Sequence, residues 1–100
     1  MTETATSKNG AAIRLTDERW SHITEEHAEL AGYRLELLEA IEEPEKILAG
    51  SAGESLALKK QKDGKTLVVV YREAAGDGFV ITAFFTRREA SVKRRKQLWP

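Results

Sequence analysis

The stretch KTLVVVYREAAGDGFVITAFFT, residues 65–86, decides the fold class of this chain. Residues 65–72 are rich in valine, and residues 79–86 combine β-branched and aromatic side chains, as strands do. A turn around residues 76–78 separates the two segments. Because the connection is so short, the sequence predicts an antiparallel pair of strands.

One further strand is expected before this pair. Residues 54–61 alternate, with two leucines on one face and Ala57 and Lys59 on the other. The dipeptide Asp63-Gly64 that follows is typical of hairpin turns. The three strands, consecutive and joined by short turns, predict an antiparallel meander.

The first part of the chain has helical periodicity instead. Thr16 is the expected N-cap of a first helix that ends near Gly32, and its inward stripe is Trp20, Ile23, His27 and Leu30. Residues 33–42 predict a second helix that stops before Pro44, with Leu35, Leu37, Leu38 and Ile41 on its core side. We expect one more helical turn over residues 45–48 and a short extended lead-in over residues 13–15.

Together these elements predict one α+β domain over residues 13–100, preceded by a flexible N-terminus over residues 1–12. N-terminal helices would pack on a three- to four-stranded antiparallel β-meander, and a basic C-terminal helix over residues 87–99 would close the chain. One hundred residues, 41% of them hydrophobic, are enough for a single modest core.

The net charge of zero hides two parts of opposite sign. Residues 1–58 contain 12 acids and 5 bases, whereas residues 59–100 contain 4 acids and 11 bases. Clustered cations attract phosphate backbones, although a run of charge is more often only the solvated side of a helix. The densest run, residues 87–96, is followed by Trp99, which could stack on a base but more often packs back on its domain.

Composition excludes several classes of site. The chain has no cysteine, and therefore no disulfide framework, thiolate metal site or thiol nucleophile. Its longest apolar run, residues 67–71, is too short to span a bilayer, and the start lacks the apolar region of a signal peptide. We expect a cytoplasmic protein without membrane contact.

Polar residues in the strands predict a candidate phosphate site. If the more apolar side of each strand faces the core, Lys59, Arg72 and Thr82 share the open face. The core side of the last strand is then Phe79, Ile81, Ala83 and Phe85. Two cations and a hydroxyl suit a phosphodiester, because cations stabilise the charge that develops in its transition state. The same residues are also ordinary on a solvated sheet, and a slip of one residue would scatter them.

The two histidines, His22 and His27, are the candidate proton-transfer groups. Five residues apart on a helix, they point about 140° from each other and miss the spacing of the helical zinc signature. We therefore expect no metal site. His27 lies in the apolar stripe, where a core role is more common, and His22 could reach the edge of the sheet.

Six short motifs can be considered together. The helical half contains Trp20-Ser21-His22-Ile23, Glu26-His27-Ala28-Glu29 and residues 41–47; the sheet half contains the strand around Lys59, residues 67–71 and residues 80–83. In this order they resemble the barnase, EndoU, colicin and RelE-like (BECR) superfamily of small phage-type and toxin-type nucleases. The similarity covers residues 13–86, and Ala28 departs from it where the motif often has proline.

The resemblance implies cleavage of RNA on the exposed sheet surface without a metal ion or other cofactor. It places the helix histidine at His22, with His27 second, the strand lysine at Lys59 and the last-strand hydroxyl at Thr82. Arg72 falls where the family pattern varies. The candidate RNA-binding cations are Lys59, Lys60, Arg72, Arg87, Arg88, Lys93, Arg94, Arg95 and Lys96.

The expected function is an endoribonuclease-like domain, for example the toxin of a toxin–antitoxin pair, with an antitoxin as its protein partner, or a phage-related effector. Two alternatives stay open. A non-catalytic RNA- or ribosome-binding domain would bind RNA in a salt-dependent way without forming product. A protein-interaction module would use the basic sheet face to dock an acidic partner and would have no affinity for RNA.

Overall fold

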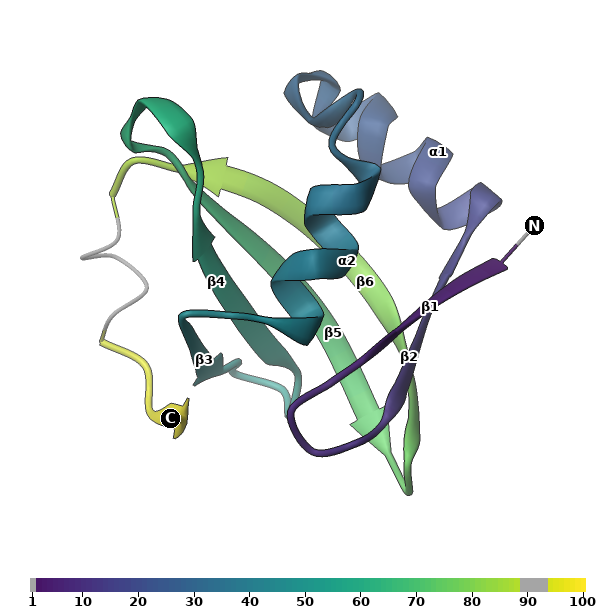
Figure 1. Cartoon of the computed structure of the whole chain (residues 1–100), viewed down its shortest axis with the longest axis vertical. Helices are drawn as coiled ribbons and strands as arrows, with labels where there is room; N and C mark the ends of the chain where they lie inside the picture. Colours follow the sequence, from purple (N-terminus) through teal and green to yellow (C-terminus); the bar gives the residue numbers. More distant parts are fainter. Residues whose placement is uncertain (1, 89–93) are drawn as a thin grey trace.

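A computed structural model describes residues 2–88 and 94–100, which fold around a seven-stranded mixed sheet (Figure 1). The strands lie in the order β1-β2-β6-β5-β4-β3-β7, and two helices connect β2 to β3. The element bounds are β1 Thr2–Thr6, β2 Ala12–Thr16, α1 Asp17–Glu26, α2 Arg34–Glu42, β3 Lys46–Ala49, β4 Ser55–Lys60, β5 Thr66–Ala74, β6 Asp77–Thr86 and β7 Gln97–Trp99.

The expected fold, helices on a three- to four-stranded antiparallel meander, is wrong. The meander β4-β5-β6 exists, but β2 and β1 extend the sheet on one side, with β2 parallel to β6, and β3 and β7 extend it on the other. The missed strands β1, β3 and β7 have three to five residues each, too few for a clear alternating pattern, whereas β2 contains the extended lead-in expected over residues 13–15. The protein is a small α+β domain built on a mixed sheet.

The N-terminal segment, expected to be flexible, contains the edge strand β1. Its residues pair antiparallel with β2, from Thr2 opposite Thr16 to Thr6 opposite Ala12, and Ala5 is buried. Gly10 closes the connecting turn with φ +84° and donates its amide to the Ser7 carbonyl at 2.9 Å. The dipeptide Asn9-Gly10 was a turn signal available in the sequence.

The prediction of a basic C-terminal helix over residues 87–99 is also wrong for the residues that the structure describes. Gln97–Trp99 is strand β7, which pairs with β3, and the Ala49 amide donates to the Lys96 carbonyl at 2.8 Å. Residues 89–93 lie outside the described residues. The extra helical turn expected over residues 45–48 is likewise strand β3, because the chain after Pro44 pairs with β4.

The two helices follow the sequence more closely. Thr16 caps α1, since its side-chain oxygen accepts the Arg19 amide at 3.0 Å. Helix α2 ends before Pro44 and buries Leu37, Leu38, Ala40 and Ile41. Leu35, expected on the core side, is 72% exposed because two residues rotate it about 200° from Leu37.

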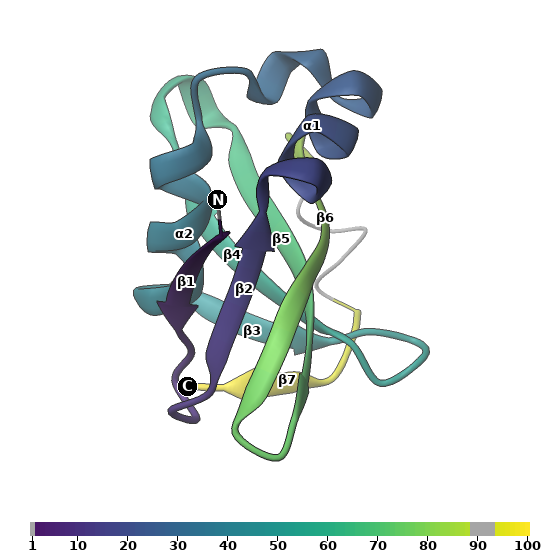
Figure 2. The same cartoon turned by 90° about the vertical axis from the view of Figure 1, so that its right-hand side faces the viewer.

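The sheet buries apolar side chains on both faces. The face that α2 covers, here the helix face, carries Ala57, Leu67, Val69, Tyr71, Val80 and Ala83 in one cluster with the helices and β2. The opposite face, here the far face, carries a second cluster of Leu48, Leu56, Leu58, Val68 and Val70. Figure 2 shows α2 on one side of the sheet and the β3–β4 loop projecting on the other.

A β-bulge at Ile81 reverses the alternation along β6. Val70 of β5 lies opposite Thr82, whereas Tyr71 lies opposite Val80, so Ile81 is the extra residue. Val80 is therefore buried on the helix face, while Phe79, expected in the core, is 44% exposed. Ile81, also expected in the core beneath the helices, packs against the far-face cluster instead.

Candidate functional site

Arg72 and Thr82 lie together on the far face. Thr82 is the direct partner of Val70, and Arg72 is two residues further along β5 on the same side. This register places their Cα atoms on the order of 8 Å apart, within reach of one phosphate for a long arginine side chain. The bulge at Ile81 sits between them, a position where sheets often re-aim a side chain next to a functional site.

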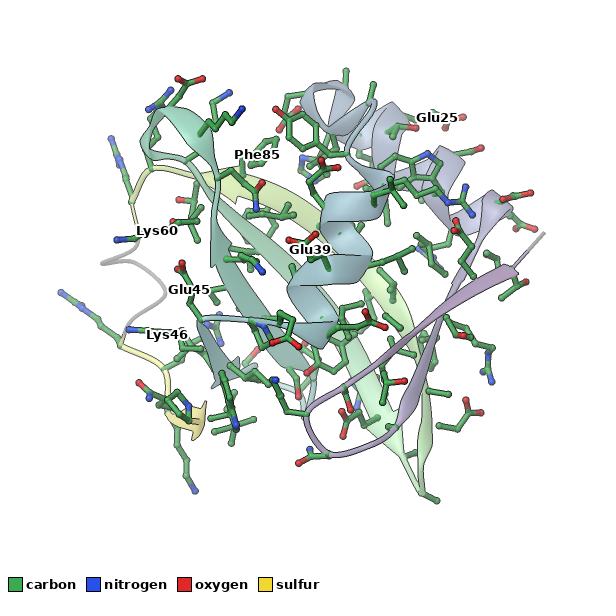
Figure 3. The ribbon with its side chains drawn as sticks, viewed as in Figure 1. Glu25, Glu39, Glu45, Lys46, Lys60 and Phe85 are labelled. Carbon is green, nitrogen blue, oxygen red and sulfur yellow. The ribbon has the colours of Figure 1, made fainter. Side chains whose placement is uncertain are left out.

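Lys59 lies on the other side of the sheet. It is paired with Leu67 on the helix face, and its Nζ is 3.3 Å from Glu39 Oε1. Figure 3 shows Glu39 on α2. The next residue, Lys60, is opposite Thr66 and shares the far face with Arg72 and Thr82. The expected common face of Lys59, Arg72 and Thr82 is therefore not found.

The Arg72 guanidinium is held by the β3–β4 loop. Its Nη2 donates to the Ala52 carbonyl at 2.9 Å, and a Cβ on Gly53 would lie 3.3 Å from Nη1. Backbone amides of Ala52 and Glu54, together with the charges of Arg72 and Arg95, hold the pKa of the Glu54 carboxyl below its usual value. Two arginines thus act on this loop, one of them from the basic C-terminal segment.

Helix α1 lies along the part of β6 that β2 does not pair. The β2–β6 ladder ends at Phe79, and beyond it the Arg19 Nη1 donates to the Ile81 carbonyl at 3.3 Å. The His27 ring lies 6.3 Å, centroid to centroid, from the Phe84 ring, which packs against the far-face cluster. Helix α1 therefore brings charged and titratable side chains to the rim of the far face.

Both histidines are accessible to solvent. The His22 side chain is 61% exposed, and its Nε2 is 3.2 Å from Glu26 Oε1. It lines a hollow of about 290 Å³ together with Thr16, Glu18 and Arg19. His27 is 32% exposed, with Nδ1 3.8 Å from Glu29 Oε2, so it is a rim residue rather than a core histidine. Each ring thus has a glutamate carboxylate close to one of its nitrogens.

Arg19 is a candidate site residue that the sequence interpretation missed. It precedes His22 by three residues, so the two side chains lie on the same side of α1 and line the same hollow. This spacing was visible in the sequence, but nothing marked Arg19 as facing the sheet until the Ile81 contact was known.

The candidate RNA-binding cations of the last segment are exposed where the structure describes them. Arg87 is exposed and donates from Nη1 to the Asp63 carbonyl at 2.6 Å, and the Arg88 amide donates to Thr86 Oγ1 at 3.0 Å. Arg94, Arg95 and Lys96 are exposed, and Lys93 lies outside the described residues. Trp99 packs back on the domain, with Lys8 Nζ 5.1 Å from its ring.

The far face thus carries Arg72 and Thr82, with Arg19 and His27 of the α1 segment at its edge and His22 beside Arg19. Such a set can bind a phosphate and transfer protons at neutral pH. Within residues 2–88 and 94–100, no three His, Asp or Glu side chains converge on a possible metal position. No helix in the described part of the chain is long and apolar enough to cross a membrane.

Comparison with known proteins adds one finding. The family model described as phage-Barnase-EndoU-ColicinE5/D-RelE like nuclease2 matches residues 2–99. This match is longer than the motif similarity over residues 13–86, and it includes the strands β1 and β7. No curated protein and no solved structure matches the chain.

Proposed function

The chain belongs to the phage-Barnase-EndoU-ColicinE5/D-RelE like nuclease2 family, and from this premise we propose that it cleaves RNA without a metal ion. The observation that carries the proposal is that Arg72 and Thr82 share the far face, with the His27 ring 6.3 Å from that of Phe84 on the same strand as Thr82. These are the side chains that an internal attack on a phosphodiester requires.

The reaction uses the nucleophile that RNA itself supplies. A histidine removes the proton of the 2′-hydroxyl, and the oxygen attacks the adjacent phosphorus. The P–O2′ bond forms, the P–O5′ bond breaks, and a proton is delivered to the leaving 5′-oxygen. The products are a 2′,3′-cyclic phosphate and a 5′-hydroxyl. Because the nucleophile belongs to the substrate, no metal-bound water is needed.

We assign the remaining roles to Arg72 and Thr82 of the far face and to Arg19 of α1. Arg72, anchored by the Ala52 carbonyl, and Arg19, anchored by the Ile81 carbonyl, are the cations that we assign to the phosphate. They would stabilise the negative charge on the non-bridging oxygens, and the Thr82 hydroxyl would orient the phosphate or the 2′-hydroxyl. Lys59 has no part in this arrangement, since its ammonium is paired with Glu39 on the helix face.

The test is cleavage of a labelled RNA in excess chelator. We expect wild-type protein to yield cyclic-phosphate ends, and His22→Ala to lower the rate by about 10²–10⁴-fold if it is the proton-transfer group. Arg72→Ala should lower it by roughly 10²-fold. Lys59→Ala is the matched control, because it removes a lysine from the opposite face, and its rate should stay within about threefold of wild type.

Three outcomes would refute the assignment: no cleavage by the folded wild-type protein, full activity in both His22→Ala and His27→Ala, or a larger loss in Lys59→Ala than in Arg72→Ala. Salt-dependent RNA binding without product would favour the non-catalytic RNA-binding alternative. Melting curves for each variant separate loss of activity from loss of folding.

We extend the proposal to a toxin-type role with RNA as the cellular target and an antitoxin protein as the partner. The supporting feature is the far-face site bordered by exposed cations, a surface that an acidic polypeptide could cover. Induced expression in a bacterial host should arrest growth with wild-type protein and not with His22→Ala. Equal growth with both would count against a toxic ribonuclease.

A further inference from the structure

One exposed aromatic residue on the far face lies between two arginines. Phe79 of β6 is paired with Arg14 on β2 and with Arg72 on β5. Residues directly opposite one another on neighbouring strands project to the same side, about 5 Å apart. Arg14, Phe79 and Arg72 therefore form one row across three strands, here called the Phe79 row.

The row lines a shallow hollow. Its walls are Arg14, Arg72, Ala74, Asp77, Gly78 and Phe79, and its volume is about 140 Å³. Phe79 is 44% exposed. It is one of three large hydrophobic residues that are exposed in the described part of the chain. The β-bulge at Ile81 turns it out of the core, where strict alternation from Ala83 would have buried it.

Both arginines are held in place beside the ring. Arg14 Nη1 lies 2.7 and 2.5 Å from the two carboxylate oxygens of Asp77, and Arg72 Nη2 donates to the Ala52 carbonyl. Neither contact uses all five donors of a guanidinium. The hollow thus presents a flat apolar surface with a fixed cation on either side.

This combination suits a nucleotide better than an apolar ligand. Single-stranded nucleic acid binds to protein through bases stacked on aromatic rings and phosphates held by cations. A hollow of this size holds part of a flat base rather than a folded peptide segment. The charge flanking the ring matches the phosphates on the two sides of the stacked base.

The position fits the proposed reaction centre, and in this respect the inference rests on the proposed function. Arg72 belongs to the Phe79 row, and it also shares the far face with Thr82, the strand partner of Val70. The base on Phe79 would therefore be that of a nucleotide next to the phosphate at Arg72 and Thr82.

We propose that the Phe79 row is a nucleobase subsite, in which one base of single-stranded RNA stacks on Phe79 while Arg14 and Arg72 hold the flanking phosphates. Stacking tolerates any base, so the subsite supplies affinity and register rather than strict sequence choice. Among the described residues that line the hollow, Asp77 is the one with a side-chain acceptor, and its carboxylate holds Arg14 beside the ring.

The experiment measures binding without cleavage. The probe is a 2′-deoxy octanucleotide of mixed sequence, which lacks the nucleophile, compared with an abasic sugar–phosphate chain of equal length. The variants are Phe79→Leu, which keeps an apolar side chain, and Phe79→Trp, which keeps a stacking ring. Leu35→Ala removes an exposed apolar side chain from α2 and is the matched control.

We expect Phe79→Leu to weaken binding of the octanucleotide about tenfold and to leave the abasic chain unaffected. Phe79→Trp should retain affinity, and its added fluorescence should be quenched by the octanucleotide but not by the abasic chain. Leu35→Ala should bind both probes as the wild type does.

Equal affinity of Phe79→Leu and wild type for the octanucleotide would overturn the proposal, as would an equal loss for both probes, which would mean that the ring only positions the arginines. Phe79-dependent binding of polyglutamate in place of the octanucleotide would assign the row to a protein partner and overturn it too. Base-dependent binding without RNA cleavage would refute the proposed function and leave the subsite intact.

Discussion

Replacing Gly78 by alanine should lower the stability of the protein by forcing β6 away from its neighbouring strand β5. Gly78 lies on β6 between Ile13 of β2 and Glu73 of β5 and is buried. A Cβ at this position would be 2.2 Å from the Arg72 carbonyl oxygen and 2.7 Å from Ile13 Cδ1. The first of these atoms belongs to the backbone, so no side-chain rotation can relieve the contact.

The size of the effect follows from the displacement required. Ordinary contact with a Cβ begins at 3.4 Å, so β5 and β6 must separate locally by 1.2 Å, the difference between 3.4 and 2.2 Å. Overpacking of this kind costs about 1–3 kcal/mol, and each ladder hydrogen bond that the movement breaks adds about 1 kcal/mol. We expect Gly78→Ala to lower the free energy of unfolding by about 3 kcal/mol.

Urea unfolding followed by tryptophan fluorescence measures this loss. With a denaturant slope of about 1.5 kcal/mol per molar, the midpoint should fall by about 2 M. Gly76→Ala is the control, because Gly76 has φ +83° and a Cβ added there would meet no atom within 4 Å, so only backbone strain of about 1–2 kcal/mol applies. A Gly78→Ala loss no larger than that of Gly76→Ala would refute the steric argument.

Three further predictions concern the turn, the acid limit and the N-terminal strand. Ala75 has φ +52° in the two-residue hairpin between β5 and β6, so Ala75→Asn should raise stability by about 0.5–1 kcal/mol; an unchanged melting temperature would contradict this. Arg14, and after it the Gly78 amide, holds the pKa of Asp77 below 3.8. The stabilising effect of the ionised Asp77 carboxylate is therefore present above that pH and is lost as the pH falls through the lower folded-state pKa. The melting temperature of Asp77→Asn should therefore lie below that of wild type at pH 7 and converge with it under strong acid, and a gap independent of pH would exclude this origin. Arg34 of α2 pairs with Glu3 of β1 and, at 2.8 Å, with Asp17 of α1, so Arg34→Ala should lower stability by roughly 1–2 kcal/mol and first expose the β1 amides to hydrogen exchange. Unchanged protection of the Ala5 amide would show that β1 is held by its pairing with β2 alone.

The candidate site was only partly accessible to sequence interpretation. His22 and His27 stood out as the two histidines, and the structure has the His27 ring beside Phe84 and the His22 ring in the hollow that Arg19 also lines. Lys59 was assigned to the open face because Leu56 and Leu58 looked like the single core side of β4. In fact Ala57 and Leu58 are both buried, on opposite faces, so hydropathy could not select the face of a strand in this sheet.

Phe79 was misplaced for a different reason. Its alternation with Ala83 and Phe85 predicted the core, but the extra residue at Ile81 inverts every position before it. A bulge is set by the register of the neighbouring strand, and no local pattern in residues 79–86 reveals it. Because of this error, the sequence interpretation did not identify the exposed ring on which the proposed base subsite depends.

The sequence by itself determined the elements with long, regular periodicity: α1 with its Thr16 cap, α2 and the three strands of the meander. It also carried motifs sufficient to indicate the nuclease family, which the match over residues 2–99 shows. These features depend on neighbours close in the chain, where local periodicity and capping are strong signals.

The tertiary structure alone decided which side chains share a face. The parallel pairing of Ile13 with Gly78, the bulge at Ile81 and the addition of β7 to β3 join residues far apart in sequence. Because side chains alternate with a period of two, one inserted residue or one unforeseen strand exchanges the two faces of the sheet. That is why Lys59 is ion-paired beneath α2, whereas Arg14, Phe79 and Arg72 form a single row.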